Sequence, residues 1–261
     1  MIMNTVILHR PDSTNPGDYY SNPSLYFDLG NVKVLDIKDP RSIDKIKDNS
    51  NVIIGGGGLV RHRKFDSHII EAVNQKYRFN SLVLWGAGHN YRPKEGTEDW
   101  HDPDYLDKFD AVGIRDFYQE RQHQWVPCAS CMHPIFDKSF DITLNTVYYV
   151  HQMNKKIRGG NLEGVTYQYN NIDFESAIEF LGSSRKIITD SYHGAYWGLL
   201  LGKDVTVVSW STKFDYFKHP VHKLYKYNLH KIKPSNIYRV LDEYRQANIN
   251  FYKEVKLAIK L

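Results

Sequence analysis

His193 lies in the segment with the most specific chemistry in this sequence, ITDSYHGAYWGLLLGKDVTVV. A strand, a polar turn, a helix and a second strand are predicted there without a gap, and His193 falls in the first turn of the helix. At that position the helix dipole favours loss of a proton from an imidazolium, and the free N–H groups favour a bound phosphate or carboxylate. The segment therefore predicts an acid beside an anion site. In a simpler alternative, Asp190 or Ser191 only caps the helix and His193 is hydrogen-bonded nearby.

Arg115 ends a predicted strand in the sequence VGIRD. A guanidinium can bind a carboxylate or phosphate through two parallel hydrogen bonds, which a lysine cannot reproduce. Because ligands of open α/β sheets bind beyond the carboxyl ends of the strands, Arg115 is a candidate for holding an anion. The alternative is an ion pair between Arg115 and Asp116 or another acid.

Four glycines directly follow another predicted strand in VIIGGGGLV, and we single out Gly56, Gly57 and Gly58. The run is neither a GxGxxG nor a Walker pattern. It predicts a cradle of backbone amides for an anion or a sugar, or else a tight turn in a crowded sheet. WGAGHN at residues 85–90 repeats the arrangement after the next strand.

Cys128 and Cys131 form a single CxxC motif, with His123 and His133 close by in the sequence. A structural zinc normally needs four well-spaced ligands, and a redox pair normally opens a helix after a strand. We therefore expect ordinary reduced cysteines and no metal site.

The elements that must position these residues follow an alternating pattern of strands and helices. In the first half, strands are predicted at residues 5–9, 32–36, 51–54, 81–85 and 110–114, and helices at 41–47 and 67–79. Periodicity fades between residues 126 and 145, and the second half has strands at 147–150, 186–189 and 205–208 and helices at 174–181, 192–201, 235–246 and 251–259. The pattern predicts an α/β protein with two Rossmann-like lobes built on parallel sheets, divided at residues 1–130 and 131–261, the second carrying the terminal helices.

The composition is that of a globular protein of 261 residues, with 41% hydrophobic and 25% charged residues. No membrane span or signal peptide is visible, and two cysteines give no disulfide framework, so we expect a cytoplasmic protein. The net charge of +4 is scattered, which suits a small anionic substrate better than nucleic acid. Much of the basic excess follows Arg185, where it fits a phosphorylated donor, peripheral contact with an anionic lipid surface, or a solvated basic face.

Several of these motifs, taken in order, resemble those of the polysaccharide pyruvyl transferases. The resemblance spans roughly residues 6–213 and rests on NPGD at 15–18, VIIGGGG, the GAG at 86–88, VGIRD, and ITDSYHG followed by LLLGKDVTVV. It implies a fold similar to the GT-B glycosyltransferases. It also implies transfer of the pyruvyl group of phosphoenolpyruvate to a pair of sugar hydroxyls, which gives a pyruvate ketal, with a sugar, glycan or lipid-linked acceptor and no further cofactor or metal.

The resemblance also implies roles for single residues. His193 matches the family's general acid, and Arg115 matches an arginine that binds the carboxylate or phosphate of the donor. Lys213 is placed like a family lysine near the donor. The remaining residues expected to contact substrate are Asn15, Gly17 and Asp18 on the acceptor side, and Gly56, Gly57, Gly58, Ser191 and Gly194. Many members have an arginine where this chain has Ser191.

Two other functions fit the same features. A GT-B-like glycosyltransferase that uses a nucleotide sugar would also need anion-binding loops between two α/β lobes, and Asp215 is a weak candidate for holding its ribose. A non-catalytic sugar-binding relative would suit the 14% aromatic content, although tyrosine is also common in ordinary cores.

Overall fold

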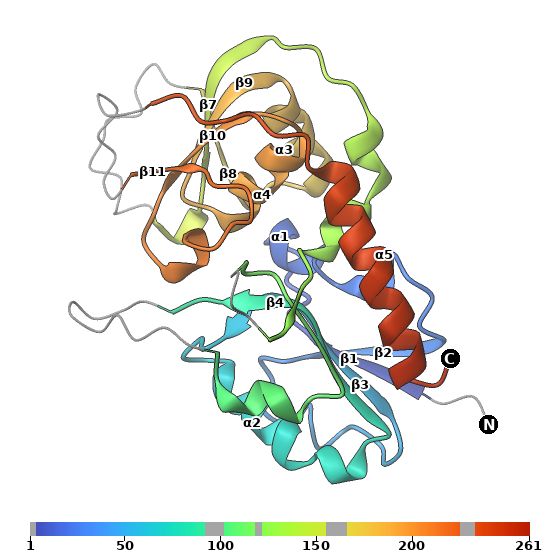
Figure 1. The fold of residues 1–261 in the computed structure, drawn as a ribbon. Helices are drawn as coiled ribbons and strands as arrows, with labels where there is room; N and C mark the ends of the chain where they lie inside the picture. The colour runs from blue at the N-terminus through green and yellow to red at the C-terminus, as the bar shows by residue number, and fades with distance from the viewer. Residues whose placement is uncertain (1–3, 92–101, 118–121, 155–165, 225–232) are drawn as a thin grey trace.

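The chain forms two parallel β-sheets, shown by a computed structural model that describes residues 4–91, 102–117, 122–154, 166–224 and 233–261 (Figure 1). In the described residues the first sheet has the order β2-β1-β3-β4-β5-β6 and the second has the order β11-β10-β9-β7-β8. The strands of the first sheet are β1 (Asn4–His9), β2 (Asn31–Asp36), β3 (Asn51–Val60), β4 (Ser81–His89), β5 (Ala111–Ile114) and β6 (Gln124–Trp125). Those of the second are β7 (Leu144–Val150), β8 (Tyr167–Tyr169), β9 (Ser184–Thr189), β10 (Asp204–Val208) and β11 (His222–Leu224). The α-helices are α1 (Pro16–Tyr19), α2 (Asp66–Asn74), α3 (Phe174–Gly182), α4 (Tyr192–Leu200) and α5 (Leu241–Ala258).

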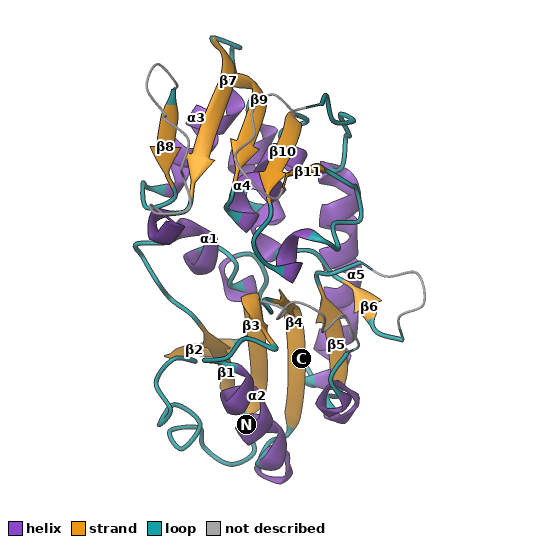
Figure 2. Cartoon of the chain, turned by 90° about the vertical axis from the view of Figure 1, so that its left-hand side faces the viewer, coloured by secondary structure: helices purple, strands orange, loops and turns teal. Residues whose placement is uncertain are grey.

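The two sheets present their carboxyl ends to each other, with α1 and the beginning of α4 between them (Figure 2). The pairings between described strands are parallel, which is typical of sheets covered on both faces. β3 and β4 are accordingly buried almost throughout, and their sequences are nearly continuous apolar or glycine runs. The predicted fold class, α/β with two Rossmann-like lobes in a GT-B-like arrangement, is confirmed.

Helix α4 has no polar face, because every one of its residues is buried. Its helix cap comes from Ser191, whose hydroxyl oxygen accepts a hydrogen bond of 3.4 Å from the amide of Gly194. The helix packs on β9 and β10 through small residues: an added Cβ at Gly198 would lie 2.8 Å from Val205 and 2.9 Å from Ile187. The core of the second lobe therefore holds α4 in place, while Tyr192 and His193 in its first turn contact residues of the first lobe.

Helix α5 packs against the first sheet although it comes last in the chain (Figure 1). Phe251, Val255 and Ile259 lie in one cluster with Trp85 of β4. The strands of the first sheet lie within residues 4–125 and those of the second within 144–224, so the segment between them carries the chain across. The exact division at residues 130 and 131 stays a prediction.

Two predicted features of the helices are wrong. Residues 41–47 form turns instead of a helix, and the apolar spacing there arises because Ile43 and Ile46 pack on the first sheet's core. The two terminal helices predicted at 235–246 and 251–259 are the single helix α5, which begins at Leu241. Ser235 is instead held beside the second sheet, since its hydroxyl donates to the Val205 carbonyl and accepts from the His222 amide, both at 2.8 Å.

The described residues contain no helix with both the length and the apolar character that a bilayer crossing requires.

Candidate functional site

The residues predicted to do chemistry meet where the carboxyl ends of the two sheets face each other. Arg115 directly follows β5, His193 lies in the first turn of α4 after β9, and Lys213 lies in a short 3-10 turn after β10. Backbone hydrogen bonds join the lobes here: the Phe117 amide donates to the Tyr216 carbonyl at 2.8 Å, and the Thr212 amide donates to the Tyr91 carbonyl at 3.0 Å. Both lobes therefore contribute to one site.

His193 is enclosed on two sides by residues from other parts of the chain. It is 7% exposed, and its Nε2 lies 3.6 Å from the Cys128 sulfur. On the other side α1 approaches so closely that a Cβ added at Gly17 would lie 2.1 Å from Nδ1. In the part of the chain that the structure describes, Nδ1 has no hydrogen-bond partner. Gly17 thus has a steric role that the sequence did not reveal.

Arg115 is a buried cation without a hydrogen-bonded partner for its guanidinium among the described residues. It is 4% exposed, and its Cζ lies 3.6 Å from the centroid of the Tyr192 ring. The expected alternative, an ion pair with Asp116, does not occur. One carboxylate oxygen of Asp116 instead accepts from the His89 amide at 2.7 Å and lies 3.5 Å from the His89 ring. A ring face offsets part of the desolvation of a guanidinium but leaves its N–H groups available to an anion.

Lys213 brings a second buried cation to the site. It is 6% exposed, and its ammonium lies 3.9 Å from the centroid of the Trp210 ring. The Trp210 indole is itself fixed, because it donates to the Asp190 carbonyl at 2.8 Å. Arg115 and Lys213 thus follow strands of different sheets and both lie where the carboxyl ends of the two sheets face each other.

Burial and the two cations together shift the pKa values of His193 and Asp18. Burial, followed by the positive charges of Arg115 and Lys213, lowers the pKa of His193 well below its usual value. Burial raises the pKa of Asp18 to about 6, against the opposing effect of the same two cations. In the unliganded protein at neutral pH, His193 is therefore neutral and Asp18 is largely ionised, which is the reverse of what an acid at position 193 requires.

Asn15 and Asp18 of the NPGD motif lie together, beside Gly17, which approaches the His193 ring. The Asn15 amide donates to the Asp18 carboxylate at 2.8 Å and accepts from the Asn170 side chain at 3.4 Å. Since Asn170 belongs to the second lobe, this contact also joins the lobes. The carboxylate of Asp18 is held in a fixed direction by an amide that bridges the two halves of the protein.

The glycine run lies close to the side chains of Asp18 and Arg115, but its glycines have different roles. Gly56 and Gly57 have φ values of +54° and +87°, which L side chains rarely adopt, and β3 shifts register after Gly57. A Cβ at Gly56 would lie 2.2 Å from the Ser21 carbonyl, so this glycine serves packing. A Cβ at Gly57 would lie 3.8 Å from the Asp18 carboxylate, and one at Gly58 would lie 3.3 Å from the Arg115 guanidinium. Gly57 and Gly58 are therefore next to the candidate site.

Ser191 and Gly194 have structural contacts that are sufficient to explain them. Ser191 caps α4, and a Cβ at Gly194 would lie 2.5 Å from the Thr189 hydroxyl and 2.6 Å from the Tyr149 ring. The alternative in which Ser191 acts as the helix cap is confirmed, and Asp190 is not the cap: its carboxylate accepts from the His151 amide at 2.6 Å.

The sequence reasoning did not assign two residues near the site to it: His9, and Cys128, which was expected to be an ordinary reduced cysteine. His9 ends β1 and is 1% exposed; its Nδ1 lies 2.9 Å from the Gly55 carbonyl, while Nε2 has no hydrogen-bond partner among the described residues. Its position at a strand end was a signal that could have identified it. Cys128 carries no such signal, because only the folded chain brings it to His193.

Both cysteines are free and buried thiols. Burial raises the pKa of Cys131 to about 12 and also raises that of Cys128. No group of three or more His, Cys, Asp or Glu side chains suited to a metal ion occurs in the residues that the structure describes.

No protein-family model matches the sequence, and no curated protein matches it. Among solved structures, the chain is similar to a functionally uncharacterized protein from Klebsiella pneumoniae subsp. pneumoniae NTUH-K2044, with 16% identity, a TM-score of 0.48, and coverage of 78% of this chain and 82% of that one. It is also similar to a putative UDP-N-acetylglucosamine 2-epimerase from Listeria monocytogenes, with 12% identity, a TM-score of 0.40, and coverage of 99% of this chain and 91% of that one. Likenesses of this order do not assign a function.

Proposed function

We propose that the chain is a ketal pyruvyl transferase that moves the pyruvyl group of phosphoenolpyruvate to hydroxyls of a sugar, glycan or lipid-linked acceptor. The observation that carries this proposal is the buried guanidinium of Arg115, which no described side chain pairs, in the same electrostatic field as a buried histidine. An enzyme that binds a small anion and protonates it requires this combination. The motif order that resembles the polysaccharide pyruvyl transferases is consistent with it.

The two cations suit the two anionic groups of phosphoenolpyruvate, a carboxylate and a phosphate. Arg115 would bind one of them through two parallel hydrogen bonds, and Lys213 would act as a point charge on the other. Gly57 and Gly58, next to Asp18 and Arg115, supply backbone that can approach the donor without side chains. Because both cations are buried, these interactions are stronger than they would be in water.

Each side chain has a defined task in the reaction. The central carbon of phosphoenolpyruvate becomes electrophilic when the methylene carbon gains a proton, and His193 supplies that proton while one acceptor hydroxyl adds to the central carbon. The phosphate then leaves as the second hydroxyl adds, which closes the ketal. Of the two hydroxyl protons released, one restores His193 and the other leaves with the phosphate. Asp18 would accept a hydroxyl proton first, and general acid and base catalysis of this kind contributes about 10²–10⁴-fold each.

The deciding experiment is incubation of the purified protein with phosphoenolpyruvate and candidate sugar, sugar-phosphate or lipid-linked acceptors, with phosphate release as the readout. We expect release that depends on the acceptor and is abolished in His193→Gln, with the thermal unfolding temperature retained. A variant at His62, which is half-buried and is not one of the candidate site residues, serves as the control for loss of a histidine. Turnover that is unchanged in His193→Gln would remove the histidine from the mechanism.

The rival functions give different results in a binding experiment. A ligand far above its dissociation constant stabilises the folded protein by about 3–4 kcal/mol, so thermal shift separates phosphoenolpyruvate from nucleotide sugars. A nucleotide-sugar glycosyltransferase would be stabilised by the latter, but Asp215, its candidate ribose ligand, is already bound to the Lys223 ammonium at 3.0 Å. A non-catalytic relative would bind sugars and release no phosphate.

A further inference from the structure

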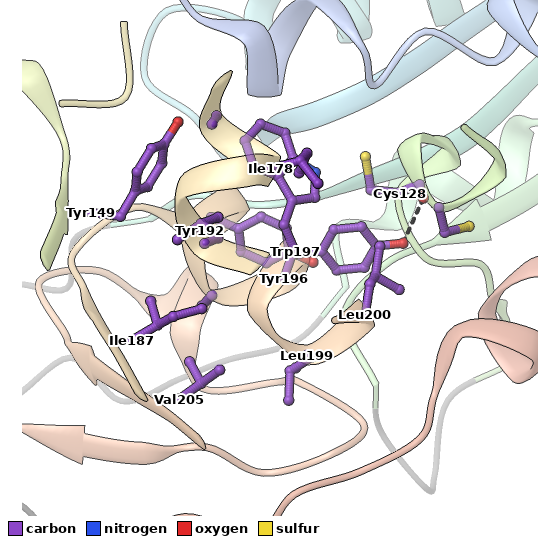
Figure 3. Packing of buried hydrophobic residues seen from close by; sticks show 14 of the residues in the cluster. Cys128, Tyr149, Ile178, Ile187, Tyr192, Tyr196, Trp197, Leu199, Leu200 and Val205 are labelled. Carbon is purple, nitrogen blue, oxygen red and sulfur yellow. Dashed lines mark hydrogen bonds between the residues drawn. The ribbon is translucent and has the colours of Figure 1, made fainter. Parts of the chain in front are cut away.

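The thiol of Cys128 lies within hydrogen-bonding distance of the candidate acid, His193. Figure 3 shows Cys128 in the closely packed interior beside α4, near Tyr196 and Trp197. Cys128 is fully buried, and its backbone is fixed by the Tyr196 hydroxyl, which donates to the Cys128 carbonyl at 2.7 Å. This bond is the dashed line of Figure 3. The sulfur is therefore held at a defined point, 3.6 Å from Nε2 of the imidazole.

A chain of hydrogen bonds leads to this sulfur from the other side. The Trp197 indole N–H donates to the Ser130 hydroxyl oxygen at 3.1 Å, and that hydroxyl lies 3.3 Å from the Cys128 sulfur. An indole N–H can only donate, so the Ser130 oxygen accepts from Trp197 and its own hydrogen remains for the sulfur. A sulfur that accepts from Ser130 in turn has its S–H available for His193.

The donor-to-acceptor direction of these hydrogen bonds determines which nitrogen of the neutral imidazole carries the proton. If Trp197 donates to Ser130, Ser130 to Cys128, and Cys128 to Nε2 of His193, then Nε2 is an acceptor and the neutral ring carries its proton on Nδ1. Nδ1 is the nitrogen beside Gly17 of the NPGD motif and has no hydrogen-bond partner among the described residues. The lowered pKa of His193 keeps the ring neutral, so that the tautomer is a meaningful property near pH 7.

We propose that Cys128 is a positioning residue for His193: the relay from Trp197 through Ser130 holds the imidazole with its proton on Nδ1, and Nδ1 is the atom that serves the reaction. This inference rests on the proposed function for its catalytic consequence, but the tautomer itself does not. The first cysteine of the CxxC motif then orients His193 through a hydrogen bond. Cys131, whose sulfur accepts from the Asn248 amide at 3.4 Å, belongs to a different network and offers a matched control.

The tautomer is measured directly by ¹H–¹⁵N correlation spectra of protein labelled at histidine nitrogen, with the His193 signals identified by their absence in His193→Gln. We expect the native protein at pH 7.5 to show His193 protonated on Nδ1, and Cys128→Ala to lose this preference. Cys131→Ala should keep the native pattern. A native ring protonated on Nε2, or a pattern unchanged in Cys128→Ala, overturns the inference. The native spectrum decides the direction of the relay even if Cys128→Ala fails to fold.

The kinetic test separates positioning from general damage. Loss of a residue that orients a functional histidine typically costs about 10–100-fold in activity. For Cys128→Ala we expect a fall of that size in kcat with an unchanged KM for phosphoenolpyruvate, and partial recovery in Cys128→Ser, which keeps a donor at the same place. Native kcat in Cys128→Ala would refute the proposal. If the native protein shows the Nδ1 tautomer but no pyruvyl transfer, the proposed function fails and the positioning of His193 stands.

Discussion

The substitution Gly17→Ala tests whether α1 and His193 form one site. The added Cβ would lie 2.1 Å from Nδ1 and 2.5 Å from Cγ of the imidazole, whereas ordinary contact begins at 3.4 Å. The ring or the α1 backbone must therefore move by the difference between 3.4 and 2.1 Å, about 1.3 Å. A misplacement of about 1 Å costs on the order of 10²-fold in rate, or about 2.7 kcal/mol of transition-state stabilisation. We expect phosphate release to fall by about that factor.

A double-mutant cycle with His193→Ala shows whether the effect acts through the ring. Overpacking of this kind costs about 1–3 kcal/mol, and each kcal/mol lowers the unfolding temperature of a protein of this size by about 2–4 °C. Gly17→Ala should lower the unfolding temperature in the native background and change it little when the imidazole is absent. An equal loss in both backgrounds, or native activity in Gly17→Ala, would show that the reasoning on this contact is incorrect.

Four further predictions concern the charges and the packing. Arg115→Lys keeps the charge but loses bidentate binding, so the KM for phosphoenolpyruvate should rise about 10–100-fold at an unchanged unfolding temperature. For Asp18, a folded pKa of about 6, above the usual 3.8, means that a stabilising contribution present at low pH is lost as the pH rises through 6. Asp18→Asn should therefore unfold at a higher temperature than the native protein at pH 8 but not at pH 4, and a difference independent of pH would contradict this. Binding of phosphoenolpyruvate should take up protons, seen by calorimetry in buffers of different ionisation enthalpy, and the uptake at pH 7.5 should fall in His193→Gln to the part that Asp18 contributes. Asn248→Ala, which leaves the buried Trp85 indole without its acceptor, should cost about 1–3 kcal/mol of stability in denaturant unfolding, whereas Gln246→Ala on the exposed side of the same helix should cost little.

The parallel strands were predictable from the sequence, and so was the location of the site at their carboxyl ends, because both depend on local sequence patterns. Buried parallel strands appear as short apolar runs, and polar residues directly after such runs must meet at one edge of a sheet. That rule singles out Arg115 in the first lobe and His193 in the second, whereas Lys213 is implied only by the family resemblance. Asp18 follows from the same rule, since the NPGD motif comes after the first strand.

The features that escaped prediction depend on contacts between distant parts of the chain. The sequence pattern predicts two terminal helices separated at residues 247–250, a stretch that includes Asn248, a poor helix former. In the structure its amide binds the Trp85 indole at 2.9 Å and the Pro127 carbonyl at 3.1 Å, and such tertiary bonds override local propensity. The contact of Cys128 with His193 joins residues 65 positions apart. A lone CxxC motif gives no indication of it.

The neutral state of His193 in the unliganded protein follows from the same cations that would bind the donor. Arg115 and Lys213 repel a proton from the ring, and burial adds to their effect. An anion carrying a carboxylate and a phosphate would neutralise both cations, so the pKa of His193 would rise as the donor binds. The ring, already protonated on Nδ1, would thus gain its second proton on Nε2 only when the donor is bound, and the Cys128 sulfur would then accept from Nε2. The buried guanidinium of Arg115, which no described side chain pairs, is in this view the group through which donor binding controls the acid, because its charge acts on the His193 ring.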